Sequence, residues 1–131
     1  METALIQLML ADAGIAGLVG TTINWSVIPQ GGAATGIVMF KVSAVPSYRM
    51  AGTVDLVESR VQIDARSPDY DTALAVGRAV EALLSGFKGT KSGVRFDGIF
   101  KLNERQDFDD TGAQTFHRVS ADYQIWSASA A

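Results

Sequence analysis

The chain has no cysteine among its 131 residues, and this absence excludes several kinds of chemistry. Without cysteine there is no disulfide framework, no thiolate ligand for zinc and no cysteine nucleophile. No apolar run approaches the roughly 18 residues that a membrane-spanning helix needs, so we expect no membrane partner. The first residues, Met1–Leu5, lack the positive charge of a secretory signal, so we expect synthesis and assembly in a cytoplasm.

Clustered positive charge is also missing. The chain has 11 basic and 14 acidic residues, a formal net charge of −3, and its basic residues are scattered singly. Proteins that bind nucleic acid on their own concentrate Lys and Arg on one surface, because phosphate neutralisation supplies most of their affinity. The pattern therefore disfavours a free-standing nucleic-acid binder.

The chain has one histidine, His117. A general base needs a partner within hydrogen-bond reach. In a strand, however, His117 points to the face opposite Ser120 and Asp122. One histidine also cannot build the usual multi-histidine zinc site. We therefore expect no enzymatic activity, no metal site and no cofactor.

Two loops match ligand-binding motifs only in part. Gly31–Gly36 has the glycine spacing of a phosphate loop, but no Lys-Ser/Thr follows and the loop enters a strand. Asp107–Gly112 begins like a calcium loop, yet Arg118 stands where the bidentate glutamate belongs. We read the first as a flexible loop. We read the second as a solvated hairpin turn, with weak cation binding or an acidic contact patch as the alternative.

What the sequence does have is a globular composition, 47% hydrophobic and 19% charged. It predicts one domain over residues 1–131, with 127–131 frayed. Ser67 is the expected N-cap of the clearest helix, Pro68 its first residue and Gly86 its stop. In chain order we expect a helix at 2–11, a short helical turn capped by Asp12, and the helix that begins at Pro68 and stops at Gly86. We expect strands at 36–45, 57–65, 94–105 and 115–126.

This order predicts an α+β fold, a four-stranded, mainly antiparallel sheet with two main helices packed on one face. Pro46 should end the first strand, which leaves residues 47–56 as a long connecting loop. Trp25 and Trp126 are candidates either for the core or for anchoring a subunit interface. Alternation predicts a polar outer sheet face made of Arg60, Gln62, Asp64, Lys101, Asn103, Arg105, Arg118, Ser120, Asp122 and Gln124.

That face has almost no aromatic side chains, whereas a sheet that binds single-stranded RNA displays stacking aromatics. It is therefore either a solvated surface or a polar surface used in assembly.

Fragments along nearly the whole chain resemble the tail-completion (tail-terminator) family of long-tailed bacteriophages. They include the opening Met1–Leu5, the Pro29-Gln30-Gly31 loop and the segment Val61-Gln62-Ile63-Asp64. Near the end they include Glu104–Phe108 and His117–Ser120. Each fragment alone is weakly specific. One departure is the loop Ala33–Gly36, where the family often has a proline before the strand.

The resemblance implies a structural subunit that forms a homo-hexameric ring at the head-proximal end of a tail tube. Such a ring stops tube polymerisation and joins the tail to the head. Its implied partners are further copies of itself, the tail tube protein, the head–tail connector (stopper or adaptor) and DNA passing through the channel without sequence-specific binding. The implied location is the virion, or a phage-like particle such as a gene transfer agent, assembled in the cytoplasm of a bacterial host.

Two sets of residues follow as candidate sites. The long loop and the acidic turn are free to reach neighbours, so the candidate inter-subunit or tube contacts are Trp25, Tyr48, Arg49, Met50, Asp107, Asp109 and Asp110. Part of the mixed-charge sheet face would line the ring channel, and the candidates there are Gln62, Asp64, Arg118, Asp122 and Gln124.

Two alternative functions stay open. The chain is a different head–tail connector component, a stopper or an adaptor, or it is a small ligand-binding domain. The latter requires a pocket with convergent polar groups, which the sequence does not display.

Overall fold

Two short helices open the chain in a computed structural model that describes residues 1–20, 22–26, 35–49, 52–109 and 115–129. Helix α1 (Glu2–Leu10) buries Ala4, Leu5, Leu8 and Met9. Helix α2 (Ala13–Val19) is capped by Asp12, whose side chain accepts a hydrogen bond of 3.0 Å from the backbone N–H of Ile15. The predicted N-cap is therefore confirmed.

Helix α3 (Tyr70–Leu84) is the longest helix and carries the predicted apolar stripe. Its N-cap is Asp69, whose carboxylate accepts from the N–H of Thr72, so the prediction of Ser67 was wrong. The Ser67 hydroxyl, two residues before the cap, instead accepts from the N–H of Asp69. A Cβ added at Gly77 would lie 3.1 Å from Val119, so a glycine here allows α3 to pack close to the sheet.

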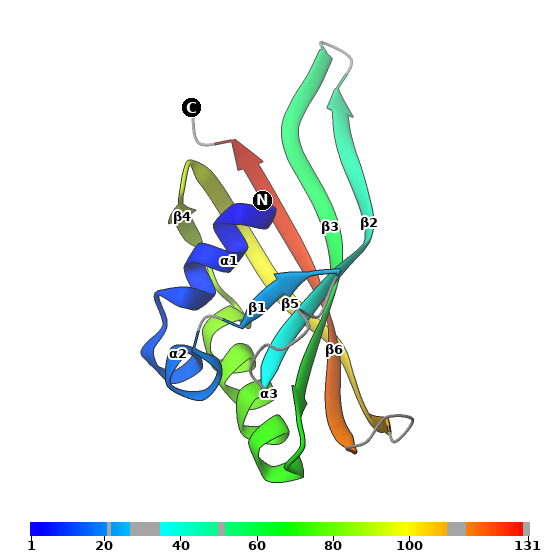
Figure 1. Cartoon of the computed structure of the whole chain (residues 1–131). Coiled ribbons are helices and arrows are strands. Elements are labelled where there is room, and N and C mark those ends of the chain that lie inside the picture. The colour runs from blue at the N-terminus through cyan, green and yellow to red at the C-terminus, as the bar shows by residue number, and fades with distance from the viewer. Residues whose placement is uncertain (21, 27–34, 50–51, 110–114, 130–131) are drawn as a thin grey trace.

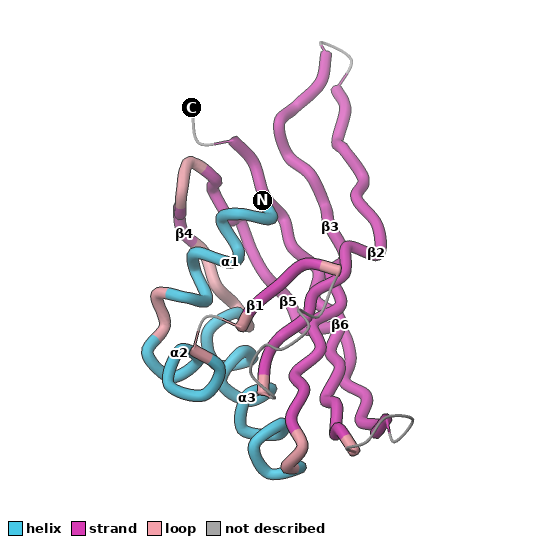
Figure 2. Tube along the Cα trace, viewed as in Figure 1, coloured by secondary structure: helices cyan, strands magenta, loops and turns pink. Residues whose placement is uncertain are grey.

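The strands form one six-stranded sheet in the order β1-β2-β3-β6-β5-β4. The pair β1–β2 is parallel and the other neighbouring pairs are antiparallel. All three helices lie on one side of the sheet (Figures 1 and 2). The strands are β1 (Ile23–Trp25), β2 (Gly36–Arg49), β3 (Gly52–Ser67), β4 (Gly89–Lys91), β5 (Val94–Asp109) and β6 (Phe116–Ser129).

The predicted fold class was therefore right in being α+β and wrong in its details. The sheet is mixed and has six strands instead of four, and three helices cover it instead of two. Strands β1 and β4 have three residues each, too few to show the alternation from which a strand is predicted. They are strands because longer neighbours supply their hydrogen-bond partners.

Residues 47–49 and 52–56 lie in strands, not in the predicted long loop. Strand β2 continues through Pro46 to Arg49, and Gly52 begins β3, so the two strands form a long hairpin that projects beyond the rest of the sheet (Figure 1). Pro46 is tolerated because a register shift lies between it and Tyr48, and edge strands and bulges accept proline.

The core lies between the sheet and the helices. Val61 and Ile63 of β3 and Tyr123 and Ile125 of β6 are buried there, as alternation predicts. Strand β6 continues to Ser129, so residues 127 to 129 are paired within the segment that we expected to fray. Along the described ranges no single helix has the length and apolarity to cross a membrane; only α1 and α2 together meet those criteria, with a bend of 88° between them.

Candidate functional site

The face of the sheet that turns away from the helices is called here the outer face. Cross-strand pairing puts side chains of β3, β6 and β5 on it in rows. The five predicted channel residues, Gln62, Asp64, Arg118, Asp122 and Gln124, come together on this face. Alternation was sufficient to predict this, because β3 and β6 pair without a register shift.

The polar side chains of the outer face bind one another. The Gln62 amide donates to Asp64 over 3.0 Å, and the Gln124 amide donates to Glu58 over 2.5 Å. Arg118 donates to the Asp107 carboxylate through Nε at 2.7 Å and through Nη2 at 3.0 Å. The face is therefore a network of paired charges and amides.

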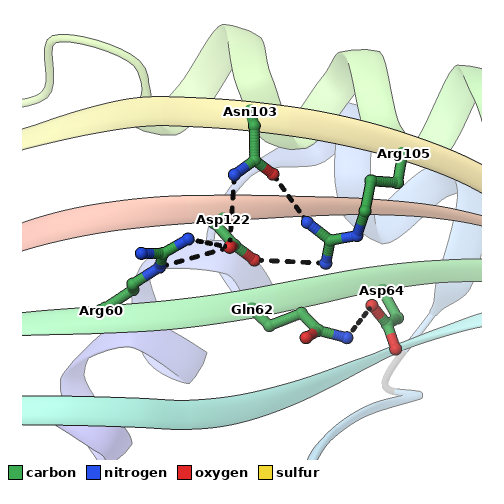
Figure 3. Close-up of polar contacts among 6 residues, drawn as sticks. All are labelled: Arg60, Gln62, Asp64, Asn103, Arg105 and Asp122. Atoms are coloured by element: carbon green, nitrogen blue, oxygen red, sulfur yellow. Dashed lines mark hydrogen bonds and ion pairs between the residues drawn. The ribbon is translucent and has the colours of Figure 1, made fainter.

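The central group of this network is Asp122, shown in Figure 3. Its side chain is only 7% exposed although no described helix covers this face. Arg60, Arg105 and Asn103 all donate to its carboxylate. Burial raises the pKa of Asp122, but these hydrogen bonds outweigh burial and hold its pKa below the ordinary value, so the carboxylate is charged at neutral pH.

Lys101 does not belong to the outer face, contrary to the prediction. A register shift between Lys101 and Asn103 changes the alternation in β5. The Lys101 ammonium consequently reaches Glu81 of α3 and also lies 2.8 Å from Glu104. Arg78 of α3 binds Glu104 as well, and hydrogen bonds from Arg78 and Lys101 lower the pKa of Glu104 to about 2. This network fastens α3 to β5.

The same register shift exposes apolar side chains that the sequence analysis missed. Phe100 lies opposite Gln124 on the outer face and is 48% exposed, and Leu102 beside it is 47% exposed. Toward the opposite edge of the sheet, Phe40, Val42 and Val45 of β2 are also exposed. Alternation alone does not locate a bulge. A run such as Phe100-Lys101-Leu102 before a polar strand end nevertheless indicates that a bulge is present.

The predicted contact residues do not gather at one place in the described structure. Trp25 is half-buried in β1, packs against the core and donates its indole N–H to the Glu2 carbonyl over 3.1 Å, so it joins β1 to α1. Asp107 is exposed on β5 and paired with Arg118. Tyr48, Arg49 and Asp109 have described backbones in β2 and β5, but their side chains lie outside the description, as do Met50 and Asp110 entirely.

A hollow of about 320 Å³ lies between the start of the chain, strands β2 and β3, the beginning of β5 and the end of β6. Met1, Lys41, Val57, Ser59, Val94, Ser127 and Ala128 line it. Lys41, its basic group, is already paired with Glu2. His117 lies away from this hollow, opposite Ser67 on β3 and with its ring 5.7 Å from that of Tyr70. Among the residues that the structure describes, no three His, Cys, Asp or Glu side chains are grouped to hold a metal ion.

Comparison with known proteins identifies the family of this chain. The family model of tail completion protein gp17 matches residues 3–128, nearly the whole chain. The chain belongs to this family. It is therefore a structural protein of the tail of a phage or phage-like particle, and the resemblance noted in the sequence and the expected location in a tail are confirmed.

Solved structures share the fold of this tail completion protein. A chain from a structure described as the virion of a native gene transfer agent particle has a TM-score of 0.79 at 21% identity, over 98% of this chain and 94% of that chain. A second solved chain has a TM-score of 0.56 at 14% identity, over 95% and 92% of the two chains. Identities this low show the fold alone. No curated protein matches the sequence.

Proposed function

We propose that this tail completion protein forms a closed homo-hexameric ring at the head-proximal end of the tail tube of a phage or gene transfer agent. There it stops tube polymerisation and joins the tail to the head. Family membership supports the location in a tail, and the count of six subunits follows the resemblance. The observation that carries the ring is a pair of strand edges, one on each side of the sheet, that other described strands cover only in part.

The first edge belongs to β2. Strand β1 pairs only with Ile37, Val38 and Met39 of β2, and no other described strand pairs with that edge from residue 41 onward. Val42 and Val45 are 56% and 57% exposed along it. Pro46 and two register shifts interrupt this edge, but its exposed apolar stretch is a surface on which another strand adds.

The second edge belongs to β5. Strand β4 covers only Val94, Arg95 and Phe96, and the Ile99 carbonyl accepts from the N–H of Gly86 over 2.8 Å. Within the described chain, no strand pairs with the edge from residue 100 to 108. Phe100 and Leu102 lie exposed beside it. Monomeric proteins protect such edges with charge or cover. Here the charged side chains of Lys101, Glu104, Arg105 and Asp107 form ion pairs within the chain, while Phe100 and Leu102 stay exposed.

The two edges are different surfaces at opposite sides of one sheet, so an edge of one copy meets the other edge of the next copy. A contact of this head-to-tail kind repeats by rotation and closes into a ring when the rotation fits. The sheets of neighbouring subunits would then form a continuous wall. The helices cover one face of that wall, which leaves the outer face to line the channel.

The outer face suits a channel for DNA. Its charges have both signs and are paired, so few phosphates would be neutralised and DNA would be bound weakly. We infer that Gln62, Asp64, Arg118, Asp122 and Gln124 face this channel. The ends of the ring would contact the tail tube protein and the head–tail connector.

The projecting β2–β3 hairpin is the element best placed for contact along the ring axis or with a neighbour (Figure 1). We infer that its end, with Tyr48, Arg49 and Met50, contacts the tube or the adjacent subunit. Trp25, Asp107, Asp109 and Asp110 stay candidates for the same contacts. Deleting Ala51-Gly52-Thr53 should abolish joining of heads and tails, whereas unimpaired joining would contradict this role.

The test of the function is electron microscopy of particles made without this gene. We expect abnormally long tails or separate heads and tails, restored by the gene in trans. Tails of normal length joined normally to heads would refute the proposal. Particle maps in which the subunit contacts the portal or adaptor but not the tube would instead assign it as a stopper or adaptor.

A further inference from the structure

One carboxylate on the outer face holds two arginines (Figure 3). Arg60 donates to Asp122 Oδ2 through Nη2 at 2.6 Å and through Nε at 3.2 Å. Arg105 Nη2 lies 3.4 Å from Asp122 Oδ1, and Arg105 Nη1 donates to Asn103 over 2.7 Å. Asn103 in turn donates to Asp122 Oδ2 over 3.4 Å. Side chains of β3 and β5 therefore converge on one carboxylate of β6, the strand between them.

The two arginines are at the surface while the carboxylate is beneath them. The side chains of Arg60 and Arg105 are 46% and 48% exposed, and that of Asp122 is 7% exposed. A phosphate approaching this face would reach both guanidinium groups. It would have to share them with a carboxylate that already occupies part of their donor set, and that carboxylate would also repel it.

The other arginines in the same region of the face are engaged as well. Arg118 binds Asp107. The Arg66 guanidinium lies over the Phe116 ring, 4.7 Å from its centroid, a cation–π contact. Asp122 differs from Asp107 in serving two arginines at once, so its removal would release two cations together.

We propose that Asp122 masks Arg60 and Arg105 from DNA phosphates, so that the outer face lets DNA pass without capturing it. This proposal rests on the proposed function, in which the outer face lines the channel. Asp122 acts here as a positioning residue: it holds the arginines flat along the sheet and cancels part of their charge. Without it, each subunit would offer two additional phosphate contacts, repeated around the ring.

The decisive variant is D122N, and D64N is its matched control. Both remove one negative charge from the outer face, but the described partner of Asp64 is Gln62, not an arginine. Binding of the purified proteins to a short fluorescein-labelled DNA duplex is measured by anisotropy across a salt titration. Thermal melts of each variant report whether it is folded.

Two new phosphate contacts steepen the plot of log affinity against log salt by about 1.8. Between about 50 and 200 mM salt, the affinity of D122N should therefore fall about tenfold more than that of the wild-type protein. D64N should match the wild-type slope, and adding R60Q and R105Q to D122N should restore it. If D122N binds DNA no more tightly and no more steeply than D64N, the masking is refuted.

A second comparison decides the matter if D122N does not fold. Masked arginines contribute nothing to DNA affinity, so R60Q and R105Q singly should keep the wild-type salt slope. A slope reduced by about 0.9 in either variant would mean that the arginines already bind phosphate and would overturn the proposal. Neither experiment requires a ring. A particle map with the outer face turned away from the channel would therefore refute the proposed function, and the DNA titration would refute the masking.

Discussion

Cysteines introduced at the two partly covered sheet edges give a test of the proposed subunit contact, because the wild-type chain has no cysteine of its own. In the double variant V42C/L102C, each subunit carries one thiol on β2 and one on β5. If the β2 edge of one copy pairs with the β5 edge of the next, each junction holds one thiol from each copy. Mild oxidation should then link neighbouring subunits.

The sheet geometry excludes a bond within one chain. Strands β3 and β6 lie between β2 and β5, so three inter-strand steps of about 4.8 Å separate them, about 14 Å in total. A disulfide needs Cα atoms closer than about 7 Å. Directly paired residues of antiparallel strands in different copies would lie about 4.5–5.5 Å apart, within that limit.

The assay is a non-reducing gel of oxidised particles. We expect a ladder of linked subunits that ends at the size of the complete ring, and moving the second cysteine from Leu102 to Phe100 tests a neighbouring register. The single variants V42C and L102C should stay monomeric. A dimer from V42C alone would indicate a two-fold contact between identical edges, and the absence of any ladder in both registers would refute edge pairing.

Three further predictions concern stability. The pKa of Glu104 is lowered to about 2 from 4.5, so its stabilising effect is complete above about pH 4.5 and disappears as the pH falls toward 2. In urea unfolding, E104Q should lower the unfolding free energy by about 1–2 kcal/mol at neutral pH, after allowance for solvent screening. A difference from the wild type that stays constant down to pH 2 would contradict this. D12A should lower the unfolding free energy by about 1 kcal/mol through loss of the α2 cap, and an unchanged urea midpoint would show that the cap is not needed. I125A should cost about 2–5 kcal/mol, because Ile125 is fully buried, and a shift in melting temperature no larger than that of a surface substitution would place Ile125 outside the core.

The elements predicted well from the sequence are those whose signals repeat over several turns or pairs. Helix α3 shows its apolar stripe over 15 residues, and β3 and β6 alternate without a register shift between them. Their inward and outward residues were therefore assigned correctly. The capping role of Asp12 was also predictable, because an acidic side chain at that position satisfies a backbone N–H locally.

The rest depends on contacts that are distant in sequence. Strands β1 and β4 exist because β2 and β5 pair with them. Pro46 does not end β2, because a register shift follows it and edge strands and bulges accept proline. The shift between Lys101 and Asn103 moves Lys101 to the helix side and leaves Leu102 exposed. The two sheet edges that carry the proposed ring contact could not be predicted from the sequence, because they depend on strand pairing and on register shifts.

The central claim is that copies of this chain close into a ring whose outer sheet face surrounds the DNA channel between tail tube and head. A density map of intact particles at a resolution that shows side chains tests it most directly. The account predicts one ring of this subunit at the head-proximal end of the tube, with Gln62, Asp122 and Gln124 facing the lumen and β2 of each copy beside β5 of the next. A subunit found elsewhere in the tail, or a ring with its helices facing the lumen, would contradict it.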